Sequence, residues 1–135
     1  SEPVLPPYEL AVKQLNELKS EKLCENSREK EYYTRLTDIL RIYLETRFGI
    51  NAMEMTSTQI MRSVRSHDTT KPSAALMKQI LEIADFVKFA KVRPLPDDNV
   101  KSFNQALQFV EATRPEPETA ESTDSTDADN QKNVN

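Results

Sequence analysis

Glycine is almost missing from this sequence: the chain of 135 residues has a single Gly, whereas average usage of ~7% predicts about nine. Phosphate-binding loops and dinucleotide-binding turns need several closely spaced glycines, so both are excluded. Tight hairpins also need residues that accept positive φ, which argues against a fold of many short strands. The chain has one Cys, one His and no Trp, too few for an internal disulfide or a structural zinc site. We therefore expect neither a metal nor a cofactor.

Long hydrophobic runs are also missing. A segment that spans a bilayer needs roughly 20 consecutive apolar residues, and the longest candidate, Ile80–Ala90, is interrupted by Glu82, Asp85 and Lys88. The start of the chain has no signal-peptide pattern. Because the first residue is Ser rather than Met, we expect the chain to be a piece of a longer protein. Any membrane attachment is then expected to come from a missing N-terminal segment.

The net charge of −4 belongs to one end of the chain. Residues 1–113 carry 16 basic and 16 acidic side chains, so the whole excess of negative charge lies in residues 114–135. A neutral folded part lacks the basic surface that nucleic-acid binding requires, and we expect no nucleic acid as partner. Residues 114–135 offer almost nothing to bury and are predicted to be a disordered acidic tail.

Apolar residues at three- and four-residue steps predict an all-α fold, a compact bundle of about five helices. These helices are expected over about residues 8–25, 26–48, 57–66, 72–90 and 97–113, with the helical domain covering residues 8–113. A Pro-rich leader or linker, residues 1–7, precedes it. Four of the predicted helix ends have capping residues: Asn26 with Glu29, Gly49 after the second helix, Thr56 with Gln59, and Asp97 with Asp98.

The fourth helix is the most apolar and is therefore expected to be packed on two sides. Its apolar set includes Phe86 and Phe89. In the fifth helix, Val100 and Phe103 are predicted to be buried with the other apolar residues at helical spacing.

Cys24 and His67 are the two side chains with nucleophilic or near-neutral acid–base chemistry. Cys24 is expected at a helix C-terminal end, which disfavours a thiolate, so we interpret it as a packed or half-exposed thiol. His67 has serines nearby, but no glycine elbow or oxyanion hole accompanies it. We interpret it as a loop histidine near a helix C-terminus.

Glu82 and Asp85 lie three residues apart on one helix face, as metal ligands or acid–base pairs can. A di-metal bundle would need further Glu and His ligands, and the sequence has no Glu-x-x-His motif. Asp85 stands between apolar neighbours on the most apolar helix. We interpret it as a buried or half-buried carboxylate that pairs with Arg or Lys or caps another helix, with a partner-binding role as the alternative.

Two further clusters have a structural and a functional interpretation. Aromatic residues at helical spacing are usually core with a hydroxyl that reaches the surface, although they can also line a cofactor or peptide groove; they are Tyr32, Tyr33, Tyr43 and Phe48. The only basic cluster comprises Lys88, Lys91 and Arg93, and nearby aspartates are expected to neutralise it.

Five segments in order along the chain resemble one protein family: Pro7–Ala11, Lys30–Leu36, Tyr43–Gly49, Ala52–Thr56 and Ala84–Lys91. Over roughly residues 7–112 the chain resembles the C-terminal helical domain of membrane proteins from Bacteroidetes aerotolerance (Bat, BatD-like) operons. None of these segments is a catalytic signature, so the specificity of the resemblance comes from their number.

The resemblance implies a parent protein with a β-rich extracytoplasmic region, one membrane helix, and this domain at the cytoplasmic face of the inner membrane. It implies an accessory or docking role beside a MoxR-type AAA ATPase or a protein with a von Willebrand A domain, and no enzymatic activity. We expect the partner to bind around Glu54 and Met55 and along the segment that contains Asp85, Lys88 and Lys91.

Two other functions stay open. One is a small enzyme, carboxylate-based or metal-assisted, that uses Glu82 and Asp85. The other is weak DNA binding through Arg62 and Arg65 on the short third helix.

Overall fold

The computed structural model describes residues 3–117, and within them the chain forms five α-helices and no strand. The all-α prediction is therefore confirmed. The helices are α1 (Pro7–Ser20), α2 (Glu29–Phe48), α3 (Ser57–Ser66), α4 (Ala74–Phe89) and α5 (Pro96–Ala112), with short 3₁₀ turns at Cys24–Asn26, Ala52–Glu54 and Lys71–Ser73. Most of the predicted acidic tail, residues 118–135, lies outside the described residues.

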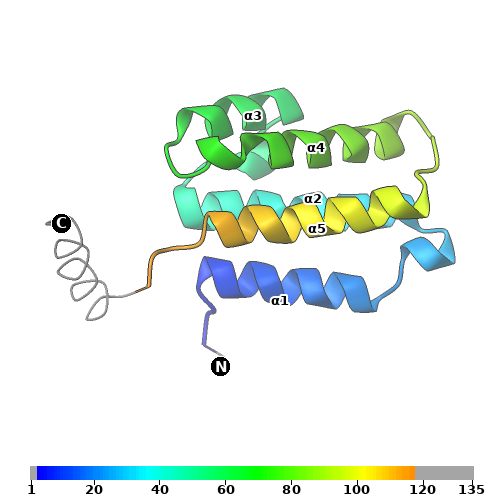
Figure 1. The fold of residues 1–135 in the computed structure, drawn as a ribbon, viewed down its shortest axis with the longest axis horizontal. Coiled ribbons are helices and arrows are strands. Elements are labelled where there is room, and N and C mark those ends of the chain that lie inside the picture. The colour runs from blue at the N-terminus through cyan, green and yellow to red at the C-terminus, as the bar shows by residue number, and fades with distance from the viewer. Residues whose placement is uncertain (1–2, 118–135) are drawn as a thin grey trace, which may run out of the picture.

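Four helices, α1, α2, α4 and α5, form an up-and-down bundle in which each neighbour is antiparallel to the next (Figure 1). The helices contact one another in the order α1–α2–α4–α5, and α5 returns to α1. The short helix α3 lies outside this ring and packs on α4. Helices α2 and α5 each contact the other three members of the bundle, and α2 carries the most buried residues of the five helices, so it is the central element.

The core of the bundle is built on α2 because its apolar residues recur on more than one side of the helix. Tyr33, Leu36 and Leu44 have no exposed surface at all, and Leu40 and Tyr43 are exposed by 1%. Burial of one such side chain is worth roughly 1.5–3 kcal/mol. The core extends from this helix to Leu15 and Leu18 on α1, Ile80 and Ala84 on α4, and Ala106 and Phe109 on α5.

Two buried tyrosines connect α2 with α5. The hydroxyl of Tyr33 donates to Asn99 Oδ1 at 2.7 Å and accepts from Ser102 Oγ at 3.0 Å. Near the opposite end of the bundle, the hydroxyl of Tyr43 lies 2.8 Å from Thr113 Oγ1. Burial and the loss of water around these hydroxyls raise the pKa of Tyr33 to about 12 and also raise the pKa of Tyr43. The prediction that these rings are core is confirmed for both residues, whereas the expectation that their hydroxyls reach the surface is wrong, because both hydroxyls have buried partners.

The two ends of the helical domain are joined by side chains. The hydroxyl of Tyr8 on α1 donates to Glu111 Oε1 on α5 at 2.6 Å, and Arg114 donates to Glu111 Oε2 at 2.8 Å. The Arg114 guanidinium also stacks over the Tyr8 ring, 4.1 Å from its centroid. Helix α1 therefore begins beside the point where α5 ends, as Figure 1 shows.

The connection between α1 and α2 differs from the prediction. Helix α1 ends at Ser20 rather than near Glu25, because Lys22 (φ 52°) adopts a left-handed conformation that a helix cannot contain. Ser27 (φ 61°) adopts the same conformation after the 3₁₀ turn. Asn26 does not cap α2: its amide donates to the carbonyl of Lys22 at 2.9 Å, and no side chain caps the first turn of α2. This local hydrogen bond stabilises the turn between α1 and α2 instead.

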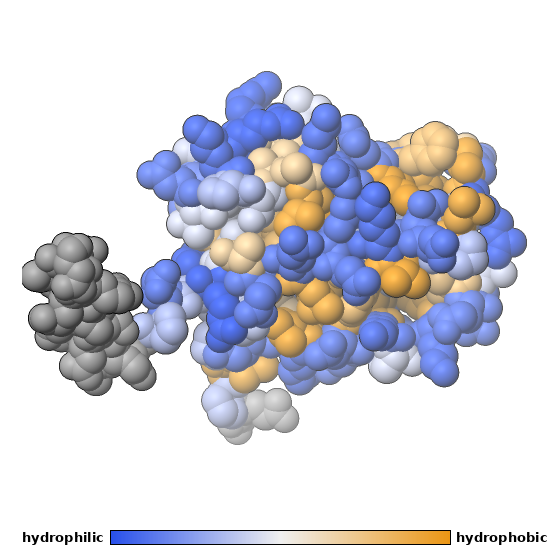
Figure 2. Space-filling view, in the orientation of Figure 1, coloured by the Kyte–Doolittle hydropathy of each residue, from blue (hydrophilic) through white to orange (hydrophobic). Residues whose placement is uncertain are grey.

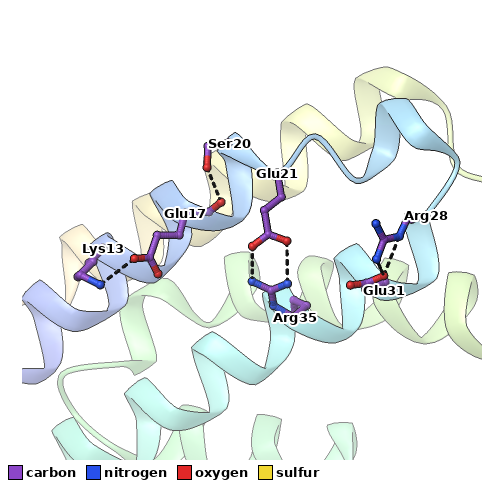
Figure 3. A network of polar contacts seen from close by, with 7 residues as sticks. All are labelled: Lys13, Glu17, Ser20, Glu21, Arg28, Glu31 and Arg35. Atoms are coloured by element: carbon purple, nitrogen blue, oxygen red, sulfur yellow. Dashed lines mark hydrogen bonds and ion pairs between the residues drawn. The ribbon is translucent and has the colours of Figure 1, made fainter.

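One ion pair lies on the surface where the end of α1 meets α2. Figure 3 shows the Glu21 carboxylate, just after α1, accepting two hydrogen bonds from the Arg35 guanidinium of α2, at 3.0 and 2.9 Å. This bidentate contact is the only one in Figure 3 that joins residues distant in sequence; the others are local, such as Lys13 with Glu17. It attaches the end of α1 to the middle of α2.

Two predicted helix caps are present. Gly49 has φ 71° and ends α2, with its N–H bonded to the carbonyl of Glu45 at 2.9 Å. Thr56 and Gln59 form the predicted capping box of α3: Gln59 N–H donates to Thr56 Oγ1 at 3.2 Å, and Thr56 N–H donates to Gln59 Oε1 at 2.9 Å.

The predicted cap at Asp97 is wrong. Helix α5 begins one residue earlier, at Pro96, because proline is well suited to the first turn, where its missing N–H is not needed. Asp97 therefore lies inside the first turn. Asp98 accepts the N–H of Leu95 at 3.1 Å and satisfies the start of the helix.

Replacement of Gly49 tests the cap of α2. A Cβ at this position would meet no heavy atom within 4 Å, so Gly49→Ala should lose about 1 kcal/mol of unfolding free energy from backbone strain alone. Gly49→Asn is the matched control, because Asn tolerates the left-handed region and should lose clearly less. Urea unfolding measures both, and equal losses for the two variants would contradict this explanation.

Candidate functional site

Helix α4 exposes two aromatic side chains that the sequence analysis placed in the core. Phe86 is 54% exposed and Phe89 is 75% exposed. The core stripe of α4 runs through Ile80, Ala84 and Val87, and at 100° per residue Phe86 and Phe89 point away from it. Exposed rings of this size, close together, are unusual on a surface that has no partner.

Further apolar side chains are exposed at the same end of the bundle. Val92 and Leu95, in the segment from α4 to α5, are 41% and 68% exposed, and Val100, which was predicted to be buried, is 61% exposed. Figure 2 shows apolar surface gathered at the right-hand end of the molecule, over the end of α4 and the segment that follows it. We call Phe86, Phe89, Val92 and Leu95 the α4-end patch.

A groove of about 830 Å³ opens at this end, between the second half of α1 and the first half of α5. We call it the α1–α5 groove. Tyr32 and Phe103, each 6% exposed, contribute to its floor. Its other lining residues are Asn16, Leu18, Lys19, Ser20, Lys22, Leu23, Cys24, Glu25, Glu29, Arg93, Pro94, Pro96, Asn99, Val100 and Asn104. The sequence did not predict this groove, because its two walls are almost eighty residues apart along the chain.

One ion pair connects the start of α2 with the segment before α5 at the edge of the groove. Arg93 Nη2 lies 3.1 Å from Glu29 Oε2 and 2.9 Å from Ser27 Oγ. The Glu29 side chain is only 11% exposed, whereas the Arg93 side chain is 70% exposed. The expectation that aspartates neutralise Arg93 is therefore wrong: the partner is Glu29, which is distant in sequence.

Cys24 lies in the wall of the groove and is partly buried. Burial, with smaller contributions from the charges of Glu29 and Glu25, raises the pKa of the Cys24 thiol to about 11. Such a thiol is protonated at neutral pH and is a poor nucleophile. This agrees with its interpretation as a packed or half-exposed thiol.

The two carboxylates of α4 have separate partners. Glu82 is exposed and lies 3.8 Å from Lys78 Nζ on the same helix. Asp85 is half-buried, and its Oδ2 accepts a 2.7 Å hydrogen bond from Ser57 Oγ at the first residue of α3. A carboxylate at a helix N-terminus is favoured by the helix dipole, so Asp85 matches the structural interpretation. Both residues border a shallow depression beside Phe86 and Phe89.

The predicted partner-binding residues fall into two adjoining segments. Glu54 is exposed, and Met55 is half-buried, with its carbonyl accepting from Arg41 Nη1 at 2.6 Å. This segment leads to Ser57 and so lies next to Asp85. Lys88 is half-buried and holds its ammonium 5.7 Å from the centroid of the Phe89 ring.

Lys91, the last of these residues, is exposed and has φ 58° just beyond the end of α4. A lysine in this conformation ends the helix and turns the chain toward α5. The structure thus places the two predicted segments side by side, and the α4-end patch adjoins them.

The remaining candidates have local contacts. The His67 ring packs edge-on against Phe48, with centroids 4.8 Å apart, and its Nδ1 accepts the N–H of Thr69 at 3.3 Å. Arg62 and Arg65 are exposed on α3. Among residues 3–117, no cluster of three or more His, Cys, Asp or Glu side chains is arranged to hold a metal ion. No helix in that range has the length and apolar character needed to cross a membrane.

Comparison of the chain with family models, with curated proteins and with solved structures finds no significant match.

The Glu29–Arg93 pair can be tested by stability. Arg93→Met leaves a mostly buried carboxylate without its cation and should lower the unfolding free energy by about 1 kcal/mol, a value reduced because Arg93 is exposed. Arg28→Met is the control, because its partner Glu31 is 41% exposed, and it should lose less than about 0.5 kcal/mol. Urea unfolding that gives equal losses would show that Glu29 is not stabilised by Arg93.

The raised pKa of Cys24 predicts slow alkylation. Relative to the ordinary value of 9.0, a pKa of about 11 lowers the thiolate fraction at pH 8 about a hundredfold. The thiolate of a less acidic thiol is a stronger nucleophile, which raises its reaction rate roughly tenfold and offsets part of this loss. Iodoacetamide should therefore react about tenfold more slowly with the folded chain than with the chain in urea. The rate should still rise at pH 10, and a plateau near pH 9 would contradict the shift.

Proposed function

We propose that the chain is a non-catalytic protein-interaction domain that binds its partner through the α4-end patch. The observation that carries this proposal is the exposure of Phe86 and Phe89, 54% and 75%, on a helix whose other face is fully packed. Burial of apolar area is the main source of binding free energy in protein association, and exposed aromatic rings are frequent centres of such interfaces.

The charged residues around the patch favour binding over catalysis. Asp85 is engaged with Ser57, Glu82 has Lys78 beside it, and the Lys88 ammonium lies near the Phe89 ring. These groups form a polar border around an apolar centre, which is the usual composition of a protein–protein interface. A carboxylate-based reaction would instead need two carboxylates that face one enclosed substrate site.

The sequence resemblance supports a cellular setting for this domain. In this proposal the domain lies at the cytoplasmic face of the inner membrane as part of a longer, membrane-anchored protein. Its role is accessory: it docks a MoxR-type AAA ATPase or a protein with a von Willebrand A domain. The segment Glu54–Met55, next to Asp85, would extend the interface from the patch toward α3.

Binding to purified partners tests this proposal. The chain should bind the MoxR-type ATPase or a von Willebrand A protein encoded beside it, and the double variant Phe86→Ser, Phe89→Ser should weaken binding at least about tenfold, or 1.4 kcal/mol. Both rings are exposed, so the fold should persist, and circular dichroism checks it. Val100→Ser is the control, because Val100 is 61% exposed but lies in the groove wall.

Two results would contradict the proposal. The first is the absence of binding between the unaltered chain and every purified component of the assembly. The second is equal binding by the double variant and by the unaltered chain.

A further inference from the structure

We infer that the α1–α5 groove is a binding site for an amphiphilic anion, a molecule with an apolar chain and a single negatively charged head, such as a medium-chain carboxylate. This site is separate from the α4-end patch, since neither Phe86 nor Phe89 lines it. The inference therefore goes beyond the proposed docking function and does not depend on it.

The size and floor of the groove fit a small apolar ligand. Its volume of about 830 Å³ lies within the range of roughly 300–1,000 Å³ that is typical of small-molecule sites. The α5 wall from Pro96 to Asn104 is about 12 Å long at 1.5 Å per residue, enough for an extended alkyl chain. Tyr32, Phe103 and Leu23 are almost fully buried and give the floor an apolar character.

The charges around the groove select an anion. Three cations and two carboxylates line it, and Arg93 is engaged by Glu29. Lys19 and Lys22 then face a single carboxylate, Glu25, so the lining keeps an excess of positive charge. A bound carboxylate would compensate this excess, while a cationic head would increase it.

The position of Lys19 joins the two parts of the site. Its ammonium lies 5.6 Å from the centroid of the Phe103 ring, above an aromatic side chain of the groove floor. A ligand whose head binds Lys19 therefore has its chain beside Phe103 and Val100. Val100 lines the groove wall and is 61% exposed, and an alkyl chain in the groove would cover it.

Cys24 contributes an apolar surface and a reporter. With a pKa raised to about 11 by burial the thiol stays neutral, so it does not repel an anion. It is the single cysteine of the chain, and it lines the groove. A ligand in the groove should therefore slow the alkylation of one known atom.

Titration with dodecanoate below its micelle-forming concentration tests the inference. Calorimetry should give saturable binding with one site, and saturating dodecanoate should slow the reaction of Cys24 with iodoacetamide severalfold. Octanoate should bind more weakly, by up to about fourfold for each methylene that is no longer buried. Dodecyltrimethylammonium, with the same chain and a cationic head, should bind at least tenfold more weakly.

Matched lysine variants test the charge selection. Lys19→Gln and Lys22→Gln should each weaken dodecanoate binding about three- to fivefold at low salt, and the difference should shrink as salt increases. Lys101→Gln is the control, because Lys101 is exposed on α5 but does not line the groove. All three side chains are on the surface, so circular dichroism should show an unchanged fold.

Several outcomes would overturn the inference. No saturable binding of dodecanoate is one, and equal or tighter binding of dodecyltrimethylammonium is another. Loss of dodecanoate binding in the Phe86→Ser, Phe89→Ser variant would assign the ligand to the α4-end patch instead. Because that variant keeps the groove intact, failure of partner docking and failure of the groove site give different results.

Discussion

The buried hydroxyls of Tyr33 and Tyr43 set the register of the bundle. Each needs a polar partner among apolar neighbours, and each finds it on α5, at Asn99 with Ser102 and at Thr113. The two tyrosines are about 15 Å apart along α2, and Ser102 and Thr113 are about 16 Å apart along α5. A slip of α5 by one turn would leave both hydroxyls without partners. This constraint therefore fixes the position of α5 along α2, and α5 forms one wall of the α1–α5 groove.

Local signals in the sequence predicted two of the four proposed helix caps correctly. Gly49 and the Thr56–Gln59 box could be read from the chain because each cap is decided by a few neighbouring residues. The turn after α1 could not, since Lys22 and Ser27 adopt positive φ without being glycine. Both residues are exposed, and their N–H groups donate locally, to the carbonyls of Lys19 and Cys24. No pattern in the sequence marks these positions.

The surface features were harder to predict than the core. Phe86 and Phe89 are apolar residues at helical spacing, and sequence alone cannot distinguish a second packed face from an exposed one. A helical projection centred on Ile80 and Ala84 places both rings on the opposite side of α4, but it does not show whether another element covers that side. The α1–α5 groove and the Glu29–Arg93 pair depend on contacts between distant segments. Such contacts follow from the arrangement of the helices, which single-sequence periodicity does not specify.

The contact of Tyr8 with Glu111 and Arg114 has a mechanical consequence. It joins the first turn of α1 to the last turn of α5, so the chain enters and leaves the bundle at one pole. Tension applied across these two points would load this small polar contact first and peel α1 from α5 sequentially, rather than shear the whole core at once. The two helices that would separate form the walls of the α1–α5 groove. A ligand bound between these walls would therefore oppose their separation under tension.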